Sequence, residues 1–250
     1  MRTKTNLIAT LVFALMVTTF TLNAQEEKES YSMVEVTYMK VKIGMEKAFE
    51  AAVKSHNEKY HKEGAYKASL DNIITGKETG WYVWIMGPCT FSDLDKRPND
   101  AAHGNDWDKN VSPTVLEYGR NEFWRYNKKL SYRKDDTAES PKLENIWFID
   151  VKKGQDYKFS EFIEKVKKAH EKRGEGSLNV YNNQFRDDEG RDVAIVWTFN
   201  NWAEIDEDNE GIKKYYEEIY GEGSWANALK DWDNSIDSIN SQVWRIGVNK

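Results

Sequence analysis

The sequence predicts an α+β fold of two tandem β-α-β-β-α-β repeats whose antiparallel sheets pack together into an intramolecular α/β barrel. A strand, a glycine turn and an amphipathic helix at residues 34–64 recur at residues 145–174. Landmark residues of the two stretches lie 110 residues apart: Gly44 and Gly154, Phe49 and Phe159, and Gly64 and Gly174. A closing strand pattern also recurs, because Trp124-Arg125 matches Trp244-Arg245. Self-similarity of this kind is typical of a duplicated unit, so we interpret the chain as a tandem duplication.

Residues 1–24 have the pattern of a secretory signal peptide. Basic residues precede an apolar run over residues 7–20, which is too short for a membrane span, and Ala24 is a small residue at a suitable cleavage point. We therefore expect cleavage after Ala24 and a polar leader at residues 25–32. The mature protein would be periplasmic or secreted, with no stable membrane anchor. The alternative is that the apolar run stays as an uncleaved anchor.

Charge and cysteine content narrow the classes of partner. The formal net charge of −6 argues against nucleic acid, because binding to a phosphate backbone needs clustered Lys and Arg. The chain has one cysteine, Cys89, so an exported form has no internal disulfide, and burial is the expected state of this thiol. The 10 Trp and 13 Tyr suit strand and core packing, or alternatively the walls of an aromatic ligand cleft.

The first repeat spans residues 33–127. Alternating apolar residues predict a strand at residues 34–38, and apolar residues at helical spacing predict a helix after it, with Gly64 as its C-terminal cap. The other expected elements are hairpin strands at residues 67–74 and 81–86, a partly helical segment at residues 91–119 that stops at Gly119, and a last strand at residues 122–126.

The second repeat, residues 145–248, follows a polar linker at residues 128–144 and shows the same order of patterns. Its long helix carries His170 on the apolar face, and Ala194 matches Trp84 at the offset of 110 residues. The other expected elements are strands at residues 146–151, 178–185, 192–199 and 242–246, and helices at residues 212–220 and 225–239.

The element order, the repeat length of about 100 residues and the tandem copy resemble the dimeric α/β-barrel superfamily over residues 33–248. That group includes antibiotic-biosynthesis-monooxygenase-like and haem-degrading domains. The resemblance implies ferredoxin-like repeats, in which one face of each sheet is not covered by helices. The uncovered faces of the two repeats would pack together within one chain, so the protein would be a monomer. In the haem-degrading branch an Asn, a Trp and a His cooperate in a cleft between helices and sheet. Asn72, Trp84 and His103 have these residue types, although no motif aligns them with that trio.

The best candidates for a small-molecule site lie in the first repeat. His56 and Tyr60 stand one turn apart on the inner face of its helix, where polar groups can orient a ligand against the sheet. Trp84 would form an aromatic wall of this site. His103 and Trp107 fall in the irregular segment, which is expected to form the rim of the site. These five residues are predicted to bind a small apolar or aromatic ligand. The alternative is that His56 and Tyr60 are hydrogen-bonded residues of a closed core.

No metal site is predicted from the spacing of ligand types. His56 and His61 are five residues apart, which on one helix turns their side chains well away from each other. Residues 206–217 nearly match a calcium-binding loop, but two lysines put positive charge inside it, so we expect no calcium site there. A polar loop that starts at His103 could bind a metal or a substrate, although such loops are most often solvated connections.

The sequence contains no motif for a nucleophilic serine, a glycine-rich phosphate loop or a Cys-x-x-Cys pair, which leaves two main hypotheses. The first is an exported small-molecule-binding or accessory protein of unknown specificity. The alternative is an oxygenase-like enzyme, cofactor-independent or haem-using, that acts in the helix–sheet cleft of the first repeat. A self-association module is a lesser third hypothesis. The sequence identifies neither a cofactor nor a catalytic residue.

Overall fold

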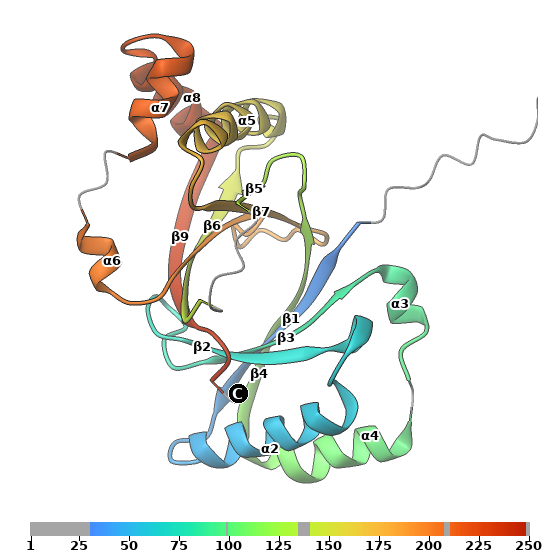
Figure 1. Ribbon diagram of the computed structural model, residues 1–250. Helices are drawn as coiled ribbons and strands as arrows, with labels where there is room; N and C mark the ends of the chain where they lie inside the picture. The colour runs from blue at the N-terminus through green and yellow to red at the C-terminus, as the bar shows by residue number, and fades with distance from the viewer. Residues whose placement is uncertain (1–30, 99, 135–140, 208–210, 249–250) are drawn as a thin grey trace, which may run out of the picture. The chain divides into compact units, whose positions relative to one another are not determined.

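The described part of the chain alternates strands and helices in the order that the sequence predicts (Figure 1). The computed structural model describes residues 31–98, 100–134, 141–207 and 211–248. The expected signal peptide at residues 1–24 lies outside the described residues, as does most of the polar leader, so cleavage and export stay predictions. Within the described ranges, no helix has both the length and the apolar character that crossing a bilayer requires.

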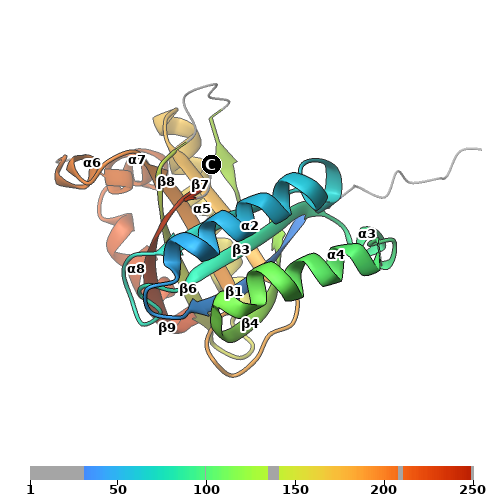
Figure 2. The same ribbon diagram turned by 90° about the horizontal axis from the view of Figure 1, so that it is seen from below.

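The first half of the described chain places one long helix between its first two strands. Its elements are β1 (Met33–Val41), α2 (Glu46–Tyr60), a 3-10 turn (Gly64–Tyr66), β2 (Ala68–Ile73), β3 (Tyr82–Cys89), α3 (Phe91–Asp95), α4 (Ala101–Asp106) and β4 (Val115–Tyr126). A π-helical turn at Trp107–Val111 and a 3-10 turn at Ser112–Thr114 connect α4 to β4. Helices α2 and α4 run side by side along the strands of this half (Figure 2).

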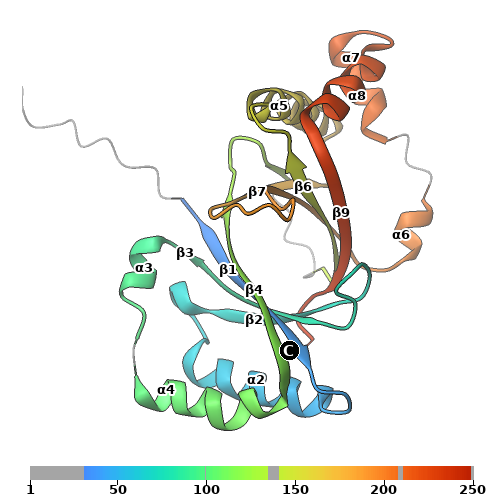
Figure 3. The ribbon, with the colours of Figure 1, turned by 180° about the vertical axis from the view of Figure 1, so that it is seen from behind.

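The second half repeats this order and has longer helices before its last strand. Its elements are β5 (Tyr132–Arg133), β6 (Leu143–Val151), α5 (Asp156–Arg173), β7 (Ser177–Asn183), β8 (Val193–Phe199), α6 (Ala203–Asp206), α7 (Gly211–Tyr220), α8 (Ser224–Ser235) and β9 (Ile236–Arg245). Helices α7 and α8 both contact α5, and the three gather at one end of β9 (Figure 3).

All pairings between the described strands are antiparallel. The order of strands is β4-β1-β3-β2-β9-β6-β8-β7-β5. Two pairings join the halves: β2 pairs with β9 at Ile73 and Trp244, and β4 pairs with β7 at Trp124 and Asn183. The second of these closes the strands from β4 to β7 into a ring. The predicted α+β class is confirmed, and the described strands form one large antiparallel sheet.

The core between the two halves holds a buried ion pair. Its apolar residues come from both halves: Val36, Tyr38, Ile73, Val83, Trp124, Ile146, Phe148, Ala194 and Trp244. Arg191, which is 3% exposed, donates from Nε and Nη2 to the Glu122 carboxylate at 2.6 and 2.8 Å. Its Nη2 also donates to the Tyr38 hydroxyl at 2.6 Å. Because Arg191 precedes β8 and Glu122 belongs to β4, this ion pair crosslinks the halves.

Helix α2 ends earlier than predicted. It stops at Tyr60, and His61 is its C-cap residue with φ −132° and ψ 33°, so the prediction that Gly64 caps this helix is wrong. The matching Gly174 does cap α5, in the left-handed region with φ +73°, as a glycine at a helix C-terminus commonly does. The two long helices therefore end differently, and the difference takes His61 out of the helix.

Two other predicted boundaries are wrong. Gly119 lies inside β4 rather than at the end of a helical segment. A Cβ atom on Gly119 would come within 2.7 Å of Cζ3 of Trp81 and 3.2 Å of Cβ of Tyr38, so the close approach of neighbouring strands explains this glycine. The last predicted helix ends at Ser235, because Ile236 adopts extended backbone and begins β9.

Three further expectations concern single segments. Cys89 is buried, as expected. The linker predicted at residues 128–144 is not loop throughout, because β5 lies within it and β6 begins at Leu143. Part of the calcium-like run at residues 206–217 lies outside the described residues, so the expected lack of a calcium site stays a prediction.

Candidate functional site

Three of the four histidines of the chain meet in the first half, and we name His56, His61 and His103 the histidine cluster. Their potential ligand atoms all lie within 4.8 Å of one another. Nε2 of His103 lies 3.0 Å from Nε2 of His56 and 3.0 Å from Nε2 of His61. The three side chains come from the C-terminal part of α2, from the residue that caps α2, and from α4.

Two hydrogen bonds orient the rings of the histidine cluster. Nδ1 of His56 donates to Oδ2 of Asp106 at 2.8 Å, and Nδ1 of His61 donates to the backbone carbonyl of Tyr66 at 2.7 Å. A carboxylate and a carbonyl can only accept, so both Nδ1 atoms carry a proton. In a neutral imidazole Nε2 is then an acceptor, and both Nε2 atoms turn a lone pair toward His103.

Burial keeps His56 and His61 in the neutral form. These side chains belong to residues that are only 1% and 5% exposed. Burial lowers the pKa of His56 despite the opposing hydrogen bond to Asp106, and it lowers the pKa of His61 to about 4. Hydrogen bonds from His56 and Lys59 hold the pKa of Asp106 below its usual range. At neutral pH the site therefore combines the neutral imidazoles of His56 and His61 with the charged carboxylate of Asp106.

All five residues predicted to bind a ligand come together around the histidine cluster. The centroid of the His56 ring lies 5.1 Å from that of Tyr60, 4.8 Å from that of His103 and 4.9 Å from that of Trp107. The ring of Trp84 lies 6.1 Å from that of Trp107. The structure thus confirms that these residues are neighbours, while their role in ligand binding stays a prediction.

The prediction that His56 and His61 face away from each other is wrong. Their ring centroids are 5.3 Å apart, because His61 lies beyond the last helical residue and no longer follows the helical spacing. The sequence includes Asp106 in the polar run that could bind a metal or a substrate, but it does not predict that Asp106, the last residue of α4, contacts His56. The available signal was the polar run that begins at His103, since it contains this carboxylate.

A different amide from the expected one contacts the tryptophan of this site. Nε1 of Trp84 donates to Oδ1 of Asn57 at 3.0 Å. Asn72, which has the residue type expected from the haem-degrading branch, instead donates to the backbone carbonyl of Trp81 at 3.0 Å. Asn57 therefore holds the indole of Trp84 in place against α2.

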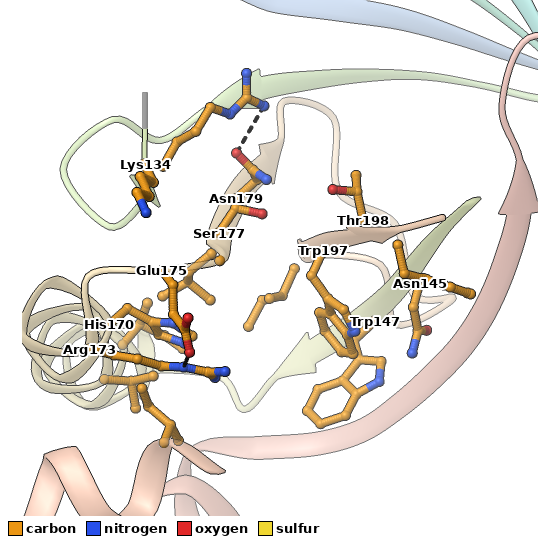
Figure 4. A pocket seen from close by; sticks show the side chains of 18 of the residues that line it. Lys134, Asn145, Trp147, His170, Arg173, Glu175, Ser177, Asn179, Trp197 and Thr198 are labelled. Carbon is orange, nitrogen blue, oxygen red and sulfur yellow. Dashed lines mark hydrogen bonds and ion pairs between the residues drawn. The ribbon is translucent and has the colours of Figure 1, made fainter. Parts of the chain in front are cut away.

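A second candidate site is an open cavity of about 1350 Å³ in the second half (Figure 4). Residues of α5 and α8 line one side of it, and residues of β6, β7 and β8 line the other. Its large apolar side chains include Trp147, Phe162, Ile195, Trp197, Trp225 and Trp232. The indoles of Trp147 and Trp197 meet edge to face, with centroids 4.9 Å apart.

His170 is the titratable group that distinguishes this cavity. Its Nδ1 atom is buried and makes no hydrogen bond, and its ring stacks on Tyr132 at a centroid distance of 6.3 Å. Burial, together with the nearby charge of Arg173, lowers the pKa of His170 to about 4. Figure 4 shows His170 and Arg173 reaching from α5 toward Trp147 and Trp197. The cavity therefore holds a neutral imidazole opposite two indoles.

This cavity lies in the half of the chain opposite to the predicted one. The sequence predicts a small-molecule cavity beside His56, whereas the structure has a large one beside His170. At two of the positions between helix and sheet the second half has the smaller side chain, because Val166 and Ile195 stand where the first half has His56 and Trp84.

Comparisons with known proteins establish a likeness of fold. No protein-family model matches the sequence, and no curated protein matches it. Among solved structures, the chain is similar to a monooxygenase-like protein of Fusobacterium nucleatum, with a TM-score of 0.55, 12% identity, and coverage of 88% of this chain and 94% of that one. A monooxygenase-like protein of Lactobacillus acidophilus gives a TM-score of 0.53 and 10% identity, over 88% and 95% of the two chains.

A chlorite dismutase variant from Candidatus Nitrospira defluvii is also similar, with a TM-score of 0.53 and 8% identity over 88% of this chain and 94% of that chain. These neighbours belong to the dimeric α/β barrel superfamily, so the resemblance inferred from the sequence is confirmed for the fold. Such low identities carry no information about individual site residues, and fold alone does not define an activity.

Proposed function

We propose that the protein is an oxygenase-like enzyme that binds a haem in the cavity of the second half. The observation that carries this proposal is His170, a half-buried histidine that lines a cavity walled by tryptophans and whose buried Nδ1 makes no hydrogen bond. Apolar walls with a few placed polar groups are the usual form of a cofactor site. The cavity volume of about 1350 Å³ exceeds the roughly 300–1,000 Å³ of common ligand pockets, so it has room for a macrocycle.

The residues of the cavity fit a haem by their chemistry. A histidine is a common axial ligand of haem iron, and His170 presents the neutral imidazole that binds a metal. Arg133 and Arg173 also line the cavity and can pair with the carboxylates of a haem, since a guanidinium can bind a carboxylate through two hydrogen bonds. The indoles of Trp147 and Trp197 can pack against its flat ring.

The oxygenase-like hypothesis is better supported than an exported binding or accessory protein. Solved structures of similar fold include two monooxygenase-like proteins and a chlorite dismutase variant. The resemblance inferred from the sequence also includes haem-degrading domains. Because likeness of fold does not transfer function, these comparisons only favour a class of chemistry, and the site is argued from His170 and its cavity.

The residues of the cavity have separable tasks in this proposal. A bound haem supplies iron for chemistry with dioxygen. His170 would hold the cofactor from α5, and the tryptophans would pack apolar surface against it. Asn145 and Thr198 also line the cavity and offer hydrogen bonds that can orient an apolar or aromatic substrate.

We expect the purified chain, free of any affinity tag, to bind one haem. Titration with haemin should change the visible absorbance of the haem until one equivalent has been added. The variant His170→Gln should bind haemin at least about tenfold more weakly, because the imidazole that would hold the haem is removed while a polar side chain of similar length remains. Dissociation constants from the absorbance titrations measure the effect, and oxygen consumption by the reduced complex tests the oxygenase class.

The matched control is His103→Gln, which changes a histidine of the other half. Its affinity for haemin should equal that of the unchanged chain. Haemin binding that survives in His170→Gln and disappears in His103→Gln would place the site in the first half. An unchanged chain that leaves the haemin spectrum unaltered would refute the proposal.

We further propose that the two halves are copies of one ferredoxin-like unit that pair within a single chain. The halves share local contacts: Nε1 of Trp124 donates to Glu122 at 3.0 Å, and Nε1 of Trp244 donates to Gln242 at 2.8 Å. The pairings β2–β9 and β4–β7 already use the sheet edges of both halves. Covered edges remove the usual template for association through strands.

We therefore expect the protein to be a monomer. Light scattering after size exclusion should give the molar mass of one chain, at most 29.2 kDa, at every concentration tested. The mass of a dimer that persists on dilution would contradict pairing within one chain as the complete assembly.

A further inference from the structure

We infer that the histidine cluster binds a divalent transition-metal ion of the zinc class through Nε2 of His56, His61 and His103. This site lies in the first half, so it is separate from the proposed haem cavity and goes beyond the proposed function. Imidazole nitrogens suit zinc and its neighbours in the first transition series. Three histidines from one chain with one open coordination position are the pattern of catalytic zinc sites.

The count of protons at the cluster points to a cation. The Nδ1 protons of His56 and His61 are committed to Asp106 and to the Tyr66 carbonyl, so two Nε2 lone pairs converge on His103. His103 has at most one proton on its own Nε2, and it lies 3.0 Å from both lone pairs. One proton cannot make two full hydrogen bonds. A metal ion satisfies all three nitrogens at once.

The distances suit a small ion. In a tetrahedral zinc site with Zn–N bonds of about 2.0–2.1 Å, neighbouring nitrogens lie about 3.3 Å apart. Two of the Nε2 pairs lie at 3.0 Å, and all potential ligand atoms are within 4.8 Å. Bringing the widest pair from as much as 4.8 Å to the separation of a tetrahedral site takes a relative shift of up to about 1.5 Å, which rotations about side-chain bonds can supply. The half-buried His103 is the ligand with most freedom to make them.

The groups behind the ligands are those that usually support a metal site. A metal-bound histidine almost always donates its other N–H to a carboxylate, a backbone carbonyl or water. His56 donates to Asp106, and His61 donates to the carbonyl of Tyr66. The other carboxylate oxygen of Asp106 accepts from Lys59 at 3.0 Å and from Asn110 at 3.1 Å. Asp106 is thus held in place to orient His56.

Zinc binding can be measured directly on the tag-free chain after chelator treatment and removal of the chelator. Isothermal titration with Zn²⁺ should show one ion per chain, and thermal melting should shift upward, because a ligand of the folded state stabilises it. Co²⁺ at the same site should give the visible absorption of a four-coordinate ion. The absence of saturable Zn²⁺ binding in the unchanged chain would overturn the inference.

Two variants test whether the histidine cluster is the zinc site: one replaces the proposed ligand His103, and the other replaces Asp106, which orients His56. His103→Gln should weaken Zn²⁺ binding by more than about 100-fold, and Asp106→Asn should weaken it by about 10–100-fold, the usual range for outer-shell groups. Either variant suffices if the other fails to fold, which circular dichroism shows. The control His170→Gln removes the only other histidine and should keep the affinity. Equal Zn²⁺ affinity in His103→Gln or Asp106→Asn, or its loss in His170→Gln, would overturn the assignment.

The same variants separate this inference from the proposed function. Haemin binding should weaken in His170→Gln and in neither of the other variants, and Zn²⁺ binding should weaken in His103→Gln and Asp106→Asn but not in His170→Gln. Failure of one test therefore leaves the result of the other intact.

Discussion

Replacing Arg191 with methionine should lower the free energy of unfolding by about 3–5 kcal/mol, the usual effect of removing one partner from a buried ion pair. The variant Arg191→Met leaves the Glu122 carboxylate buried, where only 7% of the residue is exposed, and removes a donor from the Tyr38 hydroxyl. It also removes the guanidinium, whose carbon lies 3.4 Å from the centroid of the Phe148 ring. Thermal unfolding should show a Tm lower by roughly 6–20 °C for a chain of this size.

The control combines Arg191→Met with Glu122→Gln. An amide leaves no buried charge and still accepts from Nε1 of Trp124, so the double variant should be more stable than Arg191→Met alone. The double-mutant cycle measures the coupling between the two side chains. Nε of Arg120 lies 4.0 Å from Glu122 and can relieve only part of the loss. A loss below about 1 kcal/mol, the range of exposed ion pairs, would show that this pair does not hold the halves together.

The order of elements could be predicted because short patterns are sufficient to place each one. Alternation predicts β1, helical spacing predicts α2 and α5, and glycines with positive φ make the turns before both helices at Gly44 and Gly154. The offset of 110 residues relates these elements of the two halves correctly. Each of these signals lies within the element or next to it, so no knowledge of the tertiary structure is needed.

The offset of 110 residues does not relate equivalent residues in the hairpins. An error of one residue there assigns a side chain to the wrong face of its strand. The pairings of β3 with β1 and of β8 with β6 place Val83 and Ala194 at equivalent positions. Trp84 therefore corresponds to Ile195, and its predicted match with Ala194 is wrong. A slip of one residue moves a side chain to the opposite face of a sheet. Ala194 lies in the core between the halves, so its side chain does not form part of the wall of the cavity.

The two sites depend on tertiary structure that no local pattern contains. The histidine cluster forms because α2 stops at Tyr60 and because α4 then brings His103 and Asp106 alongside it. The sequence places all five predicted ligand-binding residues correctly as neighbours, yet it does not show that His61 joins them. The cavity beside His170 depends on how α5 and α8 lie against β6, β7 and β8, which no single segment of the sequence specifies.

Replacing His170 with leucine should stabilise the haem-free protein and remove haem binding. The unpaired Nδ1 of His170 is buried, and a buried polar group without a partner costs about 1–3 kcal/mol. Leucine fills much of the same space without a polar atom, so we expect His170→Leu to raise the Tm by roughly 2–4 °C for each kcal/mol recovered. Haemin titration of the same variant should show no axial binding. A gain in stability with loss of the haem spectrum would mean that the fold keeps a destabilising residue for its function. A loss of stability in His170→Leu, with haemin binding retained, would instead identify His170 as a structural residue.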